Sequence, residues 1–240
     1  MERYIDMHCH ILPEVDDGAA SISQTIEMLQ IAYEEGIRFI IATPHYHPRR
    51  GHEHPAVLRK KLSEVRKLAR QIDEKFRIYL GTEIYFGQDI VDKLRQGDIL
   101  TLNRRNYVLV EFSPSDSFSY IQQSLQQIQM AGYQVILAHA ERYTSLRDDI
   151  DAAEHIWDMG VNIQINAGSI TGESGRKAKK FVNELMERDM VFGVGTDAHS
   201  SDKRAPRMKK AAAHVKKKYG EDYMRRVFFS NAATLLRKRK

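Results

Sequence analysis

Short apolar runs alternate with amphipathic segments along the whole chain. The runs are rich in Ile, Val and Leu, as in Ile37–Thr43 and Tyr133–Ala138, which is typical of strands buried on both faces. Between the runs, apolar residues recur at helical spacing, as at Ile22, Ile26 and Leu29. This alternation predicts strands that are connected by helices, the arrangement of a parallel sheet.

Glycines separate several of the predicted helices from the strands that follow them. The junctions Gly36-Ile37, Gly132-Tyr133 and Gly160-Val161 have the same form. We count about seven strands, and we find no linker rich in Pro, Gly or Ser between them. The sequence therefore favours one α/β domain over residues 1–240, with a TIM-like (β/α) barrel preferred and an open doubly wound sheet as the alternative.

Polar side chains that can bind metal ions follow the carboxyl ends of these runs. Because the carboxyl ends of parallel strands meet at one face of a barrel, we expect the side chains to converge there. Imidazole and carboxylate donors suit Mn, Fe, Zn or similar divalent ions. The candidates are His8, His10, His45, Glu83, Glu111, His139, Asp197 and His199.

The number of candidate donors exceeds what one ion can bind. The sequence therefore predicts a cluster of ions, which in hydrolytic enzymes lowers the pKa of a water and holds the oxygens of a phosphoryl group. A single ion with a spare histidine as general base is the alternative. Arg142 and Arg204 follow two of the predicted donors and could bind phosphate oxygens, although they could also be ordinary surface charges.

Composition excludes several other classes of function. The only cysteine, Cys9, rules out an intramolecular disulfide framework and fits the cytoplasm. No arginine follows Cys9 at the spacing of a Cys-x5-Arg phosphate loop, so we reject cysteine phosphatase chemistry. We expect neither a signal peptide nor a transmembrane segment. The net charge of +5, concentrated late in the chain, favours anionic partners, but no nucleic-acid recognition motif accompanies it.

The motifs together resemble the PHP (polymerase and histidinol phosphatase) superfamily. The resemblance rests on His8-Cys-His10, Thr-Pro-His45, Gly-Thr-Glu83, Glu111, His139-Ala-Glu-Arg142 and Thr-Asp-Ala-His199. The stretch from Asp6 to Ala19 is similar to the tyrosine-protein phosphatases of the CpsB/YwqE type, which are encoded with capsule and exopolysaccharide genes. The resemblance covers residues 3 to about 235, and its one departure is Glu14, where the family usually has glycine.

The resemblance implies a distorted (β/α)7 barrel that holds three divalent ions, with manganese preferred and Fe, Zn or Mg as alternatives. It implies that Glu83 bridges two ions. The implied ligand sets are His8, His10, Glu83 and Asp197 for one ion; Asp17 (or Asp16), His45 and His199 for another; and Glu83, Glu111 and His139 for the third.

The activity implied by the resemblance is that of a metal-dependent protein-tyrosine phosphatase. A metal-activated hydroxide would attack phosphorus without a covalent enzyme intermediate, while Arg142 and Arg204 bind the phosphate. The implied substrate is the phosphorylated, tyrosine-rich tail of a bacterial tyrosine kinase that controls polysaccharide synthesis. A PHP-type small-molecule phosphatase, such as a histidinol-phosphatase, and a metal-bound scaffold for phosphoproteins are the alternatives.

Overall fold

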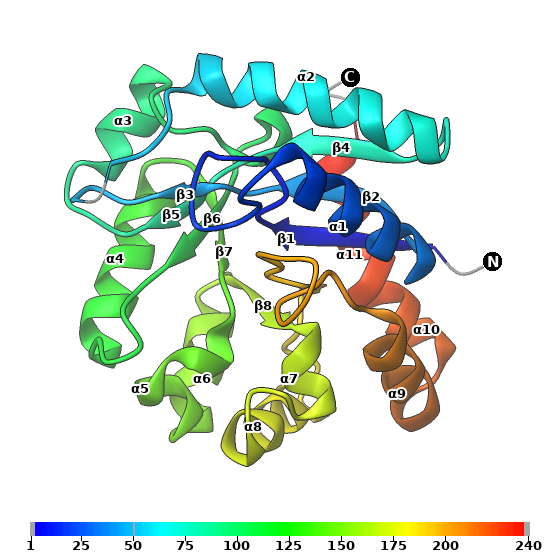
Figure 1. Ribbon diagram of the computed structural model, residues 1–240. Coiled ribbons are helices and arrows are strands. Elements are labelled where there is room, and N and C mark those ends of the chain that lie inside the picture. Colours follow the sequence, from blue (N-terminus) through cyan, green and yellow to red (C-terminus); the bar gives the residue numbers. More distant parts are fainter. Residues whose placement is uncertain (1–2, 50, 238–240) are drawn as a thin grey trace.

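A curled parallel sheet forms the centre of the protein (Figure 1), as seen in a computed structural model that describes residues 3–49 and 51–237. Every strand pairing in the sheet is parallel, so the predicted α/β class is confirmed. The strands are β1 (Tyr4–Cys9), β2 (Ile37–Ala42), β3 (His45–Tyr46), β4 (Arg77–Leu80), β5 (Glu83–Tyr85), β6 (Tyr107–Glu111), β7 (Gln134–Leu137), β8 (Asn162–Asn166) and β9 (Gly193–Gly195).

Two of the predicted runs are each followed by a second, short strand that the sequence did not predict. Thr43 and Pro44 separate β2 from β3, because proline has no N–H group to donate to a neighbouring strand. Gly81 and Thr82 separate β4 from β5 in the adjacent run. Since β2 pairs with β4 and β3 pairs with β5, the two runs remain neighbours across both interruptions. The strands therefore form the seven runs that the sequence predicts.

The last strand returns to the first one. Cys9 and Ala198 form a parallel bridge, and the N–H of His10 donates to the carbonyl of Ala198 at 2.9 Å. The N–H of Asp197 donates to the carbonyl of His8 at 2.8 Å. These contacts curl the sheet into a distorted barrel, so the predicted barrel is confirmed and the open sheet is not.

Helices surround the strands (Figure 1). Ser21 begins the first helix, because its hydroxyl accepts from the N–H of Gln24 at 3.2 Å, while Gln24 Oε1 accepts from the N–H of Ala20 at 2.7 Å. The helices are α1 (Ile22–Glu34), α2 (Pro55–Ile72), α3 (Ile90–Gln96), α4 (Phe118–Met130), α5 (Thr144–Arg147), α6 (Ile150–Asp158), α7 (Ala167–Thr171), α8 (Arg176–Glu187), α9 (Lys209–Tyr219), α10 (Glu221–Arg225) and α11 (Asn231–Leu236).

Two 3₁₀ turns, Leu102–Arg104 and Ala140–Arg142, and a π-helical turn, Arg226–Ser230, complete the regular structure. Across the described ranges, none of the helices has the length and apolar character needed to cross a bilayer.

The strands have apolar residues on both sides. One apolar cluster includes Ile5, Met7 and Ile136, and a larger one packs the helices against the sheet. A Cβ atom on Gly193 would lie 2.5 Å from the sulfur of Met7, so the close approach of β9 to β1 requires glycine there. This packing fixes the positions of the strand ends that carry the polar residues described next.

Candidate metal centre

The nine side chains that the resemblance implies as metal ligands lie at the carboxyl ends of the strand runs. Eight of them form three overlapping groups, in each of which the ligand atoms lie within 4.8 Å of one another. The ninth, His139, has its Nε2 atom 2.9 Å from Glu83 Oε1. The groups are His8, His10, Glu83 and Asp197; His10, Asp17, His45 and His199; and His45, Glu83 and Glu111.

The first group is completely buried. The Nε2 atoms of His8 and His10 lie 3.0 and 3.1 Å from Glu83 Oε2. Asp197 Oδ1 is 3.5 Å from His8 Nε2 on the other side. Its members are those that the resemblance implies for one ion.

The other two groups differ in part from the implied sets. His45 lies between them, with Nε2 at 3.3 Å from Asp17 Oδ1 and Nδ1 at 3.1 Å from Glu83 Oε2. The third group contains His45 in place of His139, the histidine that the resemblance implies. His139 nevertheless lies nearby, with its Nε2 atom 3.7 Å from Glu111 Oε2. Glu83 belongs to two groups, as a carboxylate that bridges two ions would.

The donor set fits divalent cations. Glu83 Oε2 is buried and has no hydrogen-bond partner within the described part of the chain, although three imidazole nitrogens face it. Buried carboxylates are costly unless they are paired or bound to metal, and both Glu83 and Asp197 are buried here. Nitrogen and carboxylate oxygen atoms are the donors that Mn, Fe and Zn accept.

The tautomers of three histidines also suit metal binding. Nδ1 of His10 lies 2.8 Å from Asp16 Oδ2, and Nδ1 of His199 lies 2.9 Å from the carbonyl of Asp197. Because these oxygens can only accept, each Nδ1 carries a proton, and Nε2 is the atom that has the lone pair whenever the ring is neutral. Such a hydrogen bond on the remote nitrogen is the usual support of a metal-bound histidine.

Gln164 imposes the same tautomer on His8. Its Oε1 accepts from the backbone N–H of His139 at 2.9 Å, and this donor fixes the orientation of the amide. His8 Nδ1, 3.1 Å from the same Oε1, must therefore donate, which leaves its Nε2 free for an ion. Our sequence reasoning missed Gln164. The available signal was a buried polar residue inside the apolar run Val161–Ile165.

Charges in the site shift the pKa values of the histidines and of the carboxylates. Burial acts to lower the pKa of His10, but the hydrogen bond with Asp16 and the nearby carboxylate of Glu83 outweigh burial and raise it to about 9. Burial acts to raise the pKa of Glu83, but the charge of His8 and the close imidazole nitrogens of His10 and His139 hold it well below the usual value. The negative potential that favours protonated imidazoles here also favours bound cations.

Asp16 and Asp17 have different positions in the loop after β1. Asp17 Oδ1 lies 3.3 Å from His45 Nε2 and 3.5 Å from His199 Nε2, so it faces the second group. Asp16 instead accepts from His10 Nδ1 and, at 2.9 Å, from the backbone N–H of His45. The geometry therefore suits Asp17 as a ligand and Asp16 as a residue that orients two histidines.

The backbone is unusual at two of these residues. His139 has a φ of 32° and Asp197 has a φ of 53°, a region that residues other than glycine seldom occupy. Strained backbone of this kind concentrates at functional sites. A Cβ atom on Gly195 would lie 2.6 Å from Cβ of His8, so the strand beside His8 must have glycine at that position.

A cavity of about 720 Å³ opens above the ligands. Arg142 and Arg204 both line it. Arg142 donates to Asp197 Oδ2, while Arg204 forms an ion pair with the same oxygen at 2.9 Å and donates to the carbonyl of Asp197 at 3.1 Å. His47 and His52, which lie on the loop after β3, also line this cavity. The two arginines can therefore reach an anion that enters above the metal ligands.

Glu14 lies outside this lining. Its φ is 60°, a left-handed conformation that explains why glycine is usual there, and its carboxylate pairs with Lys61 of α2 at 2.8 Å. The extra carboxylate is thus directed to α2 and not to the cavity.

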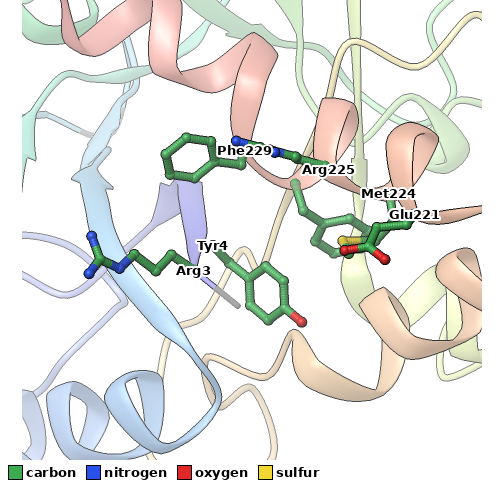
Figure 2. Close-up of a pocket in the computed structure, with 7 residues that line it drawn as sticks. Arg3, Tyr4, Glu221, Met224, Arg225 and Phe229 are labelled. Atoms are coloured by element: carbon green, nitrogen blue, oxygen red, sulfur yellow. The ribbon is translucent and has the colours of Figure 1, made fainter. Parts of the chain in front are cut away.

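A separate hollow of about 500 Å³ lies near Tyr4, the first residue of β1 (Figure 2). Among the described residues that line it there are one carboxylate, Glu221, and no imidazole, so they provide no comparable ligand set. Its lining consists of Arg3, Tyr4, Glu221, Met224, Arg225, Phe228 and Phe229.

Comparisons with known proteins agree with this geometry. The chain is 32% identical over 237 residues to the tyrosine-protein phosphatase CpsB of Streptococcus pneumoniae, covering 97% of this chain and 98% of the relative. It is 33% identical over 235 residues to the tyrosine-protein phosphatase YwqE of Bacillus subtilis, covering 97% and 91%.

Solved structures show the same fold. A crystal structure from work on YwqE of Bacillus subtilis and CpsB of Streptococcus pneumoniae, described as unique metal-dependent tyrosine phosphatases, matches with a TM-score of 0.85 at 32% identity and covers 92% of this chain and 89% of that one. Histidinol phosphate phosphatase of Lactococcus lactis matches with a TM-score of 0.61 at 14% identity, covering 92% and 95%, which supports the PHP-type fold.

The family model for capsular polysaccharide synthesis proteins, CpsB/CapC, matches residues 4–237. Sequence, fold and the converging ligand groups thus agree, and the chain belongs to the CpsB/CapC family.

Proposed function

We propose that the protein is a metal-dependent phosphatase that hydrolyses phosphotyrosine in proteins. The observation that carries this proposal is the set of three overlapping ligand groups with two arginines above it in one cavity. The relatives that match along nearly the whole chain are named tyrosine-protein phosphatases, which supports the same reaction.

The proposed cofactor is a set of three divalent ions, with manganese preferred and Fe, Zn or Mg as alternatives. The three ligand groups support this number, and the mixture of nitrogen and oxygen donors supports these metals. When bound, such ions lower the pKa of water and neutralise charge on phosphoryl oxygens.

The protein's own residues would bind and orient the substrate. Arg142 and Arg204 would bind the non-bridging phosphate oxygens through their guanidinium groups. Asp197, to which both arginines are hydrogen-bonded, positions them side by side. Tyr85 and Phe112, which also line the cavity, provide apolar surface for the tyrosine ring.

The substrate we propose is the phosphorylated tail of a bacterial tyrosine kinase that controls capsule or exopolysaccharide synthesis. The description of the matching family as capsular polysaccharide synthesis proteins supports this role. We also propose that the protein acts in the cytoplasm, where its single buried and unpaired cysteine would remain reduced.

The test is phosphate release from a phosphotyrosine peptide by the protein as purified, after treatment with a chelator, and after Mn²⁺ is restored. We expect activity that the chelator abolishes and Mn²⁺ recovers. Histidinol phosphate is the comparison substrate, and faster turnover of it would indicate a small-molecule phosphatase. Metal-loaded protein that hydrolyses neither substrate would contradict the proposed reaction and favour a binding scaffold.

A further inference from the structure

A second hollow adjoins the cavity above the metal ligands. Its volume is about 890 Å³, and it shares His47 and Tyr85 with that cavity. Phe86, which follows β5, and Tyr120, in the first turn of α4, line only the second hollow. A peptide with its phosphotyrosine in the first cavity could therefore place a neighbouring side chain in the second.

Tyr120 gives the second hollow an aromatic ring that is exposed but held in place by its neighbours. The residue is 45% exposed, although most aromatic rings nearby are covered. Its ring packs edge-on against Phe86 at 5.8 Å and against Phe112 at 6.1 Å between centroids. Phe86 and Phe112 stack on each other at 5.5 Å. A ring that is already held in this way loses little conformational freedom when a ligand packs on it.

Tyr85 continues the aromatic surface toward the metal centre. Its ring stacks on the imidazole of His47, with centroids 4.4 Å apart and an interplanar angle of 29°. Since both rings border the two hollows, aromatic surface extends from one hollow to the other. We call Tyr85, Phe86 and Tyr120 the aromatic wall.

The charges in the second hollow do not suit a second phosphate. Asp89 is paired with Lys93 at 2.8 Å, and Asp116 accepts from the backbone N–H of Ser113 at 2.9 Å. Of the residues that the structure describes here, Arg49 is the one arginine in this lining, whereas the first cavity has Arg142 and Arg204. A neutral ring would pack on the wall without leaving a buried charge unpaired.

We propose that the second hollow is a subsite for an aromatic side chain that lies close to the phosphotyrosine in the substrate, and that Tyr120 determines this preference. The proposal rests on the proposed phosphotyrosine phosphatase activity. In an extended peptide every second side chain faces the same way, so the preferred position is two residues before or after the phosphotyrosine.

The test compares catalytic efficiency on three substrates. The first is a phosphotyrosine peptide with Phe both two residues before and two residues after the phosphotyrosine, the second is the same peptide with Ala at both places, and the third is p-nitrophenyl phosphate. The variants are Tyr120→Ala, Tyr120→Phe and, as a control on an exposed residue at the far end of the same helix, Met130→Ala. We expect Tyr120→Ala to lower kcat/KM about 5-fold on the Phe peptide alone. Tyr120→Phe, which keeps the ring, and Met130→Ala should match the wild-type protein on all three substrates.

Two results would overturn the subsite while leaving the phosphatase intact. One is a wild-type protein that hydrolyses the Phe and Ala peptides equally well. The other is a Tyr120→Ala loss of the same size on all three substrates, with an unchanged thermal melting curve. Absence of phosphate release from every substrate by the Mn²⁺-loaded wild-type protein would instead refute the proposed function, and the subsite with it.

Discussion

Replacing Gln164 by Leu should weaken metal binding without removing any metal ligand. Gln164 is fully buried and makes four hydrogen bonds through its side-chain amide. Oε1 accepts from His8 and from the N–H of His139, and Nε2 donates to Ile165 and Asn166. Leucine has similar volume but no polar atoms, so the change removes these contacts with little effect on packing.

The magnitude follows from the two donors among the four groups that lose a partner, because a carbonyl oxygen left without one donor costs less than an N–H group. The N–H of His139 and Nδ1 of His8 would be buried without an acceptor, and each costs about 1–3 kcal/mol. We therefore expect a loss of roughly 2–6 kcal/mol in the free energy of unfolding. Loss of the hydrogen bond that orients a metal-bound histidine lowers metal affinity by about 10- to 100-fold.

The assay measures the Mn²⁺ concentration that gives half-maximal activity on a phosphotyrosine peptide, together with urea unfolding. Gln129→Leu is the matched control, because Gln129 Nε2 donates to the carbonyl of Met159 at 2.9 Å, between α4 and α6 and away from the site. The control should lose about 1 kcal/mol of stability and keep the wild-type Mn²⁺ dependence. An unchanged Mn²⁺ midpoint in Gln164→Leu would refute the orienting role of this residue.

Three further predictions concern other parts of the site. Asp197→Ala and His139→Ala should each abolish turnover with an unchanged far-UV circular dichroism spectrum, and retained activity in either variant would contradict its assignment as a ligand. Arg142→Lys should lower kcat/KM on phosphotyrosine peptides about 100-fold, because lysine cannot form the forked contact with phosphate, and a loss below 3-fold would argue against phosphate binding. Gly195→Ala should displace His8 and raise the Mn²⁺ requirement for activity, while an equal requirement would show that β9 can move aside.

The sequence predicted the barrel because its signals are local and repeated. Each run of apolar residues, such as Tyr133–Ala138, reports its own burial, and the alternation with helices restricts the topology. The strand ends then predicted which polar side chains meet, since parallel strands present their carboxyl ends on one face. The short strands β3 and β5 were not predicted, because two or three residues after a proline or a glycine show no repeated apolar pattern.

The residues that orient the metal-binding histidines were harder to predict. Gln164 and Asp16 act through hydrogen bonds to residues far away or in an irregular loop, and no periodic pattern reports such contacts. The place of His45 between two ligand groups depends on the orientation of its ring, which spacing along the chain does not determine. The pairing of Glu14 was not predicted either, because Glu14 lies in a loop and its partner Lys61 lies on α2, 47 residues later.

The return of β9 to β1 has a consequence for how the protein is made. Asp6 and Thr196, which hydrogen-bond beside the site, are 190 residues apart in the sequence. A chain still emerging from the ribosome would contain His8 and His10 but not Asp197 or His199, so it could not assemble the first ligand group. That ion site could therefore be filled only after β9 and Asp197 have been synthesised, whereas the residues of the third group are present earlier. By mass action the loaded ions would then hold the early and late parts of the chain together, so metal supply would influence the protein's lifetime in the cell as well as its activity.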